Sequence, residues 1–155
     1  MSAQADEIEA RVRSIYERAA FVQALGIRLE SAAAGTVTAV LPVRPDHLQQ
    51  DGLVHAGVLA TMADHAAGAA AVTGVAPEET VLSVEFKLNL LRPARGPELR
   101  VRAEVLRQGR RLCVVESSVF GGPRDAPELV AKATVTLAVV PADVGRRGAL
   151  RPGRT

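Results

Sequence analysis

VHAGVLATMADHAAGAAAVT, residues 54–73, predicts one long helix that the rest of the chain has to cover. Ala, Val, Leu, Met and Gly make up most of it, so the helix is apolar on nearly every side and belongs inside a protein. Its length alone would allow a membrane span, but Asp64 and His65 near its middle argue against one. A carboxylate inside such a helix has to be paired, protonated or functional, because burying it alone is costly.

The flanking segments have the patterns of one surface helix and several strands. Residues 6–25 carry apolar residues at steps of three and four, which predicts an amphipathic helix ended by Gly26. Residues 81–91 alternate, with one apolar face and a polar face made of Ser83, Glu85, Lys87 and Asn89. Further strands are expected at residues 27–33, 36–42, 98–108, 110–121 and 129–140, and a loop at 43–53.

This order of elements predicts an α+β fold. A helix, two strands, the long apolar helix and four more strands favour an antiparallel sheet packed on one helix. A flat sheet cannot cover a helix that is apolar on most sides, so we expect a curled sheet wrapped around it and help from a second subunit. We expect residues 1–143 to form this single domain and residues 144–155 to be a basic, disordered tail.

Charge, cysteine content and the absence of known motifs limit the partners, location and cofactors that we expect. The net charge of +2 comes from the tail, whose last eleven residues hold four arginines and no acid. The rest is net acidic and poor in aromatics, so no nucleic-acid partner is expected. The single cysteine and the acidic start without an apolar signal region favour the cytoplasm. No metal-ligand spacing, Gly-rich phosphate loop or nucleophile-elbow motif occurs, so we expect neither metal nor cofactor.

The chain also carries short motifs in a specific order, at residues 25–27, 52–61, 84–86, 91–93 and 107–110, with Asp64, Ala66 and Gly68 between them. Over residues 21–140 they resemble the PaaI-like thioesterases of the hotdog fold. The resemblance implies a curved antiparallel sheet around one central helix, and an acyl-CoA thioesterase for which coenzyme A is part of the substrate. Hotdog dimers pair their helices and place two sites at the interface. We therefore expect a homodimer at minimum, and a homotetramer built as a dimer of dimers.

Thioester hydrolysis needs a carboxylate that acts at the carbonyl carbon and donors for the developing oxyanion. The resemblance gives the first role to Asp64, as general base or as nucleophile. The donors would be the backbone N–H groups of Ala56 and Gly57, because amides in a first helical turn lack intrahelical partners. The family commonly has Gly where this chain has Ala56, which keeps the amide. The alternatives are that Asp64 caps a backbone or pairs with His65 or an arginine, and that Gly57 only permits close packing.

Helical geometry predicts that two chains build each site. His55 and Asp64 are nine residues apart, which is about 13–14 Å along a helix axis and on opposite faces. One helix therefore cannot bring its own start and its own Asp64 to the same carbonyl carbon. A two-fold partner can supply the helix start, and the resemblance implies the same arrangement.

Other polar residues are weaker candidates. Gln49, where the family commonly has Asn, and Ser83, where relatives have Ser or Thr, would position water or the thioester. As a strand residue, Ser83 equally fits a solvent-facing position. His55 either helps to fix the loop or the thioester or is structural, while we expect His65 to pack and His47 to be solvated.

The phosphates of coenzyme A would need cations outside the cleft. Guanidinium groups suit phosphates, and the candidates, each of which equally fits a solvated role, are Arg92, Arg95, Arg107, Arg110 and Arg111. The alanine-rich lining permits a medium acyl chain or an aryl ring, and the thiol carrier, coenzyme A or an acyl-carrier protein, stays open. The rival functions are a hydroxyacyl-thioester dehydratase on the same fold, whose pattern fits the spacing less well, and a non-catalytic acyl-CoA-binding module.

Overall fold

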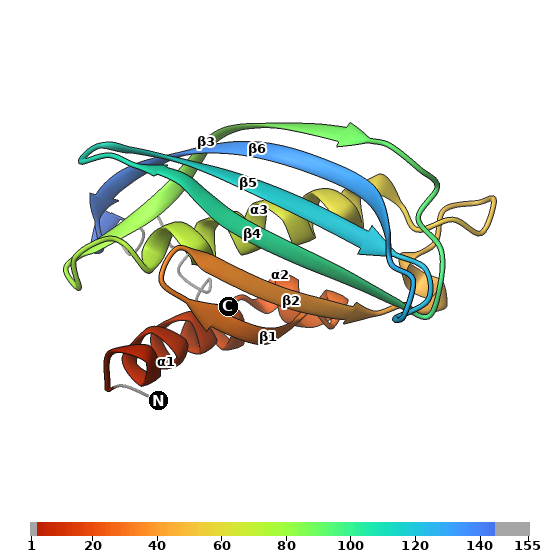
Figure 1. Cartoon of the computed structure of the whole chain (residues 1–155), viewed down its shortest axis with the longest axis horizontal. Helices are drawn as coiled ribbons and strands as arrows, with labels where there is room; N and C mark the ends of the chain where they lie inside the picture. Colours follow the sequence, from red (N-terminus) through yellow and green to blue (C-terminus); the bar gives the residue numbers. More distant parts are fainter. Residues whose placement is uncertain (1–2, 145–155) are drawn as a thin grey trace, which may run out of the picture.

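A six-stranded antiparallel sheet curls around one long helix in the computed structural model (Figure 1). The strands lie in the order β1-β2-β4-β5-β6-β3, and every neighbouring pair is antiparallel. This architecture confirms the predicted α+β hotdog fold. The structure describes residues 3–144, so the tail predicted at 144–155 lies outside the described residues from 145 onward.

The elements follow the predicted order with one correction. The helices are α1 (Ala3–Arg18), α2 (Ala20–Leu25), the short η1 (Pro45–His47) and α3 (Ala56–Val72). The strands are β1 (Arg28–Ala33), β2 (Thr36–Pro42), β3 (Glu79–Leu90), β4 (Glu98–Gln108), β5 (Leu112–Gly121) and β6 (Glu128–Pro141). The single helix predicted over 6–25 is wrong, because Ala19 has a ψ of 86° and separates α1 from α2.

The sheet covers α3 as the apolar sequence of this helix requires. α3 packs against β2, β3, β4, β5 and β6, and much of its buried surface is alanine. Such small side chains allow helix and strands to approach closely. One buried polar contact crosses this layer, since the Ser117 hydroxyl on β5 donates a hydrogen bond of 2.8 Å to the Ala63 carbonyl oxygen. The helix is thereby fixed against the middle of the sheet.

A bulge interrupts β3, the edge strand beside β6. Ser83 pairs with buried Leu137 and Phe86 pairs with buried Val135, although the two β3 residues are three apart. Residues on one face of a regular strand are an even number apart, so Val84 is the extra residue of a bulge. Ser83 therefore lies on the helix-facing side. The polar face predicted for Ser83 from simple alternation is wrong.

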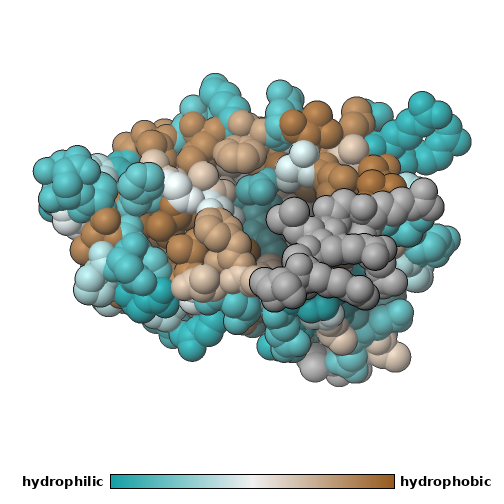
Figure 2. Space-filling model, turned by 180° about the vertical axis from the view of Figure 1, so that it is seen from behind, coloured by the Kyte–Doolittle hydropathy of each residue, from teal (hydrophilic) through white to brown (hydrophobic). Residues whose placement is uncertain are grey.

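β3 also leaves apolar side chains uncovered at the edge of the sheet. Five large hydrophobic residues on or just after this strand are between 44% and 63% exposed: Leu82, Val84, Phe86, Leu90 and Leu91. Figure 2, which views the molecule from the side of α3, shows hydrophobic surface along the margin where β3 lies. An edge strand with such a patch is typical of a protein–protein contact.

α1 is fastened to the far end of α3. The Arg11 guanidinium donates hydrogen bonds of 2.9–3.0 Å to the carbonyl oxygens of Val75, Ala76 and Glu79, which connect α3 to β3. The Tyr16 ring packs edge-on against His65, with 4.5 Å between the ring centroids. α1 therefore forms a fixed wall beside α3. Among residues 3–144, no helix is long and apolar enough to cross a membrane.

Candidate functional site

Asp64 and Ser83 meet where the middle of α3 faces β3. The Ser83 hydroxyl donates a hydrogen bond of 2.6 Å to the Asp64 Oδ1 atom. The bulge makes this contact possible, because it turns Ser83 toward the helix. Within the described part of the chain, Asp64 forms no ion pair with His65 or with an arginine. The half-buried carboxylate is thus held by a hydroxyl and keeps its second oxygen for another partner.

An apolar pocket of about 410 Å³ lies beside this pair. α1, α3, β3 and β6 form its walls, and most of its lining is aliphatic: Ile15, Ala19, Gly68, Ala69, Val72, Val81, Leu82 and Leu137. The pocket meets two requirements of thioester hydrolysis, a hydrocarbon slot and a carboxylate next to it.

The start of α3 carries the predicted oxyanion donors. His55 is the N-cap residue, and its Nδ1 accepts a hydrogen bond of 2.9 Å from the Gly57 N–H. Among the hydrogen bonds of residues 3–144, none is donated by the Ala56 N–H. The amide of Ala56 is therefore available to an oxyanion at the positive end of the helix. The Gly57 N–H, by contrast, is already bonded to the His55 ring.

A second pocket, of about 510 Å³, lies at this helix start and includes Gln49, His55, Ala56 and Arg92 in its lining. The Gln49 side chain bends back into its own loop, where Oε1 accepts hydrogen bonds from the backbone N–H groups of Asp51 and Leu53. The Arg92 guanidinium donates to the Leu129 carbonyl oxygen at 2.9 Å. In this protomer Gln49 therefore orders the loop before α3.

One protomer keeps the two halves of the predicted site apart. Asp64 and Ser83 line one pocket, while Ala56 and His55 line the other. Ala56 and Asp64 are eight residues apart on α3, or about 12 Å along the axis. A reacting carbonyl has to lie about 3 Å from both the carboxylate and the oxyanion donor. A single copy cannot satisfy both contacts.

Two further histidines have structural positions. The prediction that His47 is solvated is wrong: it is 1% exposed, and its Nδ1 accepts from the Arg44 N–H at 3.0 Å. The His47 carbonyl oxygen accepts from the His55 N–H at 2.9 Å, which links the loop to the start of α3. His65 packs against Tyr16 as expected, and burial lowers the pKa of His65, although the charge of Asp64 acts in the opposite sense. Nothing in the local sequence signals the burial of His47.

The five candidate arginines are all exposed and form two groups. Arg92 and Arg95 line pockets next to the start of α3. Arg107, Arg110 and Arg111 lie around the turn between β4 and β5, at the opposite end of the molecule (Figure 1). They cannot all contact one bound nucleotide of the same protomer. The structure also gathers no group of three His, Cys, Asp or Glu side chains suited to a metal ion within residues 3–144.

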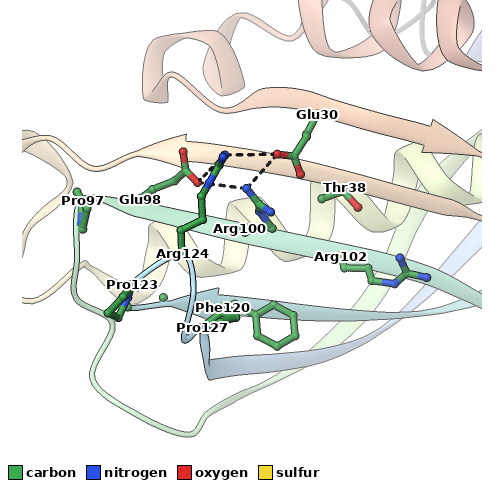
Figure 3. Close-up of a pocket in the computed structure, with 12 residues that line it drawn as sticks. Glu30, Thr38, Pro97, Glu98, Arg100, Arg102, Phe120, Pro123, Arg124 and Pro127 are labelled. Carbon is green, nitrogen blue, oxygen red and sulfur yellow. Dashed lines mark hydrogen bonds and ion pairs between the residues drawn. The ribbon is translucent and has the colours of Figure 1, made fainter.

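A larger cavity, of about 620 Å³, lies away from Asp64 on the outer face of the sheet. Figure 3 shows an ion-pair cluster on its wall, in which Arg100 contacts Glu30 at 2.9 Å and Glu98 at 3.3 Å, and Arg124 reaches both carboxylates. These carboxylates are already neutralised by arginines. The cavity therefore presents no free base or nucleophile for hydrolysis.

Comparison with known proteins finds thioesterases and esterases among the relatives of this chain. The family model described as thioesterase superfamily matches residues 51–127, which include the helix start, Asp64 and Ser83. A protein named as an esterase from Halobacterium salinarum is 32% identical over 121 residues, covering 74% of this chain and 79% of that protein. Human acyl-coenzyme A thioesterase 13 is 28% identical over 114 residues, covering 72% of this chain and 81% of that protein.

Solved structures agree with these sequence matches. The crystal structure of a thioesterase family protein from Silicibacter pomeroyi superposes with a TM-score of 0.82 and 34% sequence identity. The superposition covers 85% of this chain and 97% of that one. The likeness therefore extends over almost the whole fold and is not confined to the motif around α3.

Proposed function

The chain belongs to the thioesterase superfamily and is a thioester hydrolase, and on this premise we propose that it hydrolyses acyl-CoA to a free acid and coenzyme A. The observation that carries the proposal is the Ser83–Asp64 hydrogen bond of 2.6 Å beside an apolar pocket. A relative of similar length is named as an acyl-coenzyme A thioesterase, which supports the same substrate class.

Two routes use the carboxylate of Asp64. As a general base, it takes a proton from a water that Ser83 helps to position, and the water oxygen attacks the thioester carbonyl carbon. As a nucleophile, it attacks that carbon itself and forms a mixed anhydride that water then hydrolyses. In both routes the carbon–sulfur bond breaks and the thiolate of coenzyme A leaves and takes up a proton.

The developing oxyanion would be held by the start of α3 from a second chain. The Ala56 N–H is available there, and the Gly57 N–H follows when the thioester oxygen replaces the His55 ring as its acceptor. Both amides lie at the positive end of the helix dipole, which favours a negative charge. His55 and Gln49 then act indirectly: His55 caps the start of α3, and Gln49 orders the loop before it.

A homodimer would bring the two halves together. The separation of about 12 Å between Ala56 and Asp64 along α3 supports a site shared by two chains, and the exposed apolar side chains of β3 would give the second chain a surface on which to dock. A homotetramer, made from two such dimers, is part of the same proposal. We assign Arg92 and Arg95 to the phosphates of coenzyme A before the other three arginines, because they line pockets beside the helix start.

The proposal is tested by incubating the protein with a panel of acyl-CoAs and a thiol reagent that reports free coenzyme A. We expect release by the wild type and a fall of about 10²–10⁴-fold in kcat for Asp64→Asn, with an unchanged melting curve. A dehydratase would consume a hydroxyacyl-CoA without releasing thiol, and a binding module would bind acyl-CoA without turnover. Near-wild-type turnover by a folded Asp64→Asn variant would refute the mechanism.

A further inference from the structure

The pocket beside Asp64 is long. Asp64, Gly68 and Val72 line it from successive turns of α3, a distance of about 12 Å at 1.5 Å per residue. The opposite wall runs from Ser83 to Thr80 on β3, which is about 10 Å of extended strand. Two independent elements thus define a slot of similar length that begins at the carboxylate.

Gly68 leaves the middle of this slot open. A Cβ atom added at Gly68 would lie 3.8 Å from Leu137 Cδ2, an ordinary van der Waals contact, so a methyl group fits at this position of the pocket lining. Ile15 of α1 lines the same pocket. Its position is fixed, because the hydrogen bonds of Arg11 hold α1 against the segment after α3.

We propose that this slot selects acyl chains of medium length and that Gly68 and Ile15 determine the limit. The inference rests on the proposed function and adds its substrate class. Carbon–carbon bonds of about 1.5 Å advance about 1.3 Å each in an extended chain, so about nine or ten carbons fill the slot. An aryl ring fills only its first part, and the lining contains no aromatic side chain except the imidazole of His65.

The test is a chain-length profile of kcat/KM for saturated acyl-CoAs from butanoyl to hexadecanoyl, together with phenylacetyl-CoA. The wild type should be fastest near decanoyl-CoA. Gly68→Leu should lower kcat/KM for decanoyl-CoA about tenfold or more and change that for butanoyl-CoA less than about twofold, because only the longer chain meets the new side chain. Ile15→Ala should shift the optimum to longer chains by about two carbons.

Opposite shifts in the two variants separate pocket shape from general damage. Gly68→Ala is the graded control: it should give a smaller shift, and it should melt at or above the wild-type temperature because Ala replaces Gly within a helix. An equal loss at every chain length in Gly68→Leu, an unshifted Ile15→Ala profile or a preference for phenylacetyl-CoA would overturn the inference while leaving thioesterase activity intact. Absence of thioester hydrolysis by the wild type would overturn the proposed function, and this inference with it.

Discussion

The Ser83 hydroxyl contacts the carboxylate of Asp64, which we assign to catalysis, whereas the Ser117 hydroxyl only fixes α3 to the sheet. Ser83 on β3 donates to Asp64, and Ser117 on β5 donates to the Ala63 carbonyl oxygen. We expect Ser83→Ala to lower kcat about 10–100-fold with little change in stability. Ser117→Ala is the matched control and should cost about 1 kcal/mol of unfolding free energy with kcat preserved.

Steady-state kinetics and urea titrations on both serine variants would check that Ser83 affects kcat and Ser117 affects stability. A Ser83→Ala enzyme with wild-type kcat would show that the hydroxyl only orients the carboxylate in the resting protein. Loss of activity in Ser117→Ala without loss of stability would equally contradict the assignment.

His65 gives the stability a pH dependence whose sign is fixed by its burial. Desolvation lowers the pKa of His65 below its ordinary value of 6.5. In acid the unfolded chain therefore binds a proton that the folded chain resists, and unfolding is favoured. The contribution of the neutral imidazole is fully present above pH 6.5 and is lost as the pH falls toward the lowered pKa.

We expect the free energy of unfolding to fall between pH 7.5 and pH 5.5 more steeply in the wild type than in His65→Phe. The phenylalanine keeps a ring against Tyr16 but cannot titrate. Urea unfolding at the two pH values measures the difference. Parallel falls in the two proteins would show that His65 does not carry this pH dependence.

At the scale of elements, Arg11 provides a polar attachment of α1 to the segment after α3. Arg11 makes three hydrogen bonds to carbonyl oxygens in the segment from the end of α3 to the start of β3. Among residues 3–144, the partner of Arg13 is Glu9, on the exposed face of α1. Arg11→Ala should therefore lower the unfolding free energy by about 2 kcal/mol. Arg13→Ala should cost less than about 0.5 kcal/mol.

Urea titrations of the two arginine variants test the comparison, and amide exchange in α1 should accelerate only in Arg11→Ala. Equal stability of the two variants would mean that the packing of Val12 and Tyr16, which are both buried, suffices to hold α1.

The elements also show which parts of the fold the sequence can predict. The apolar run of α3 and the alternation within the strands are local patterns, and they placed most elements within a few residues. The break at Ala19 was missed, because alanine favours helix and only tertiary packing interrupts it there. The bulge at Val84 was missed because it is a property of the pairing with β6, which lies about fifty residues further along the chain.

The same distinction applies to the candidate site. The resemblance identified Asp64, Ser83 and the helix start from their order in the chain, and the structure brings Asp64 and Ser83 into contact. It keeps Ala56 and Gly57 about 10–12 Å from Asp64 along α3, as the spacing predicted. The burial of His47 and the capping of Gly57 by His55 depend on side-chain placement, which no local pattern specifies.

At the scale of the whole molecule, the proposed two-chain site predicts complementation between inactive variants. Asp64→Asn removes the carboxylate, and Ala56→Pro removes one amide hydrogen. Proline is tolerated at the first position of a helix, and His55 already has the extended backbone, with φ −62° and ψ 138°, that a residue before proline adopts. Each variant alone should be nearly inactive.

Co-refolding equal amounts of these two variants should restore about a quarter of the wild-type kcat. Half of the random dimers are then mixed, and one of the two sites in each mixed dimer has both parts intact. Recovery would require the mixing step, so the two variants combined as preformed dimers serve as the control. A mixture that stays inactive after co-refolding would place both parts of the site in one chain.

The uncovered edge of β3 also bears on how the protein reaches its final form. A newly folded chain exposes the unpaired outer edge of β3, with five exposed apolar side chains on or just after this strand. Such an edge can join the wrong strand as readily as the right one, which leads to aggregation. The yield of soluble protein should therefore be limited by competition between dimerisation and aggregation through this edge. Charged substitutions on the edge would reduce aggregation but would also leave the chain as a monomer.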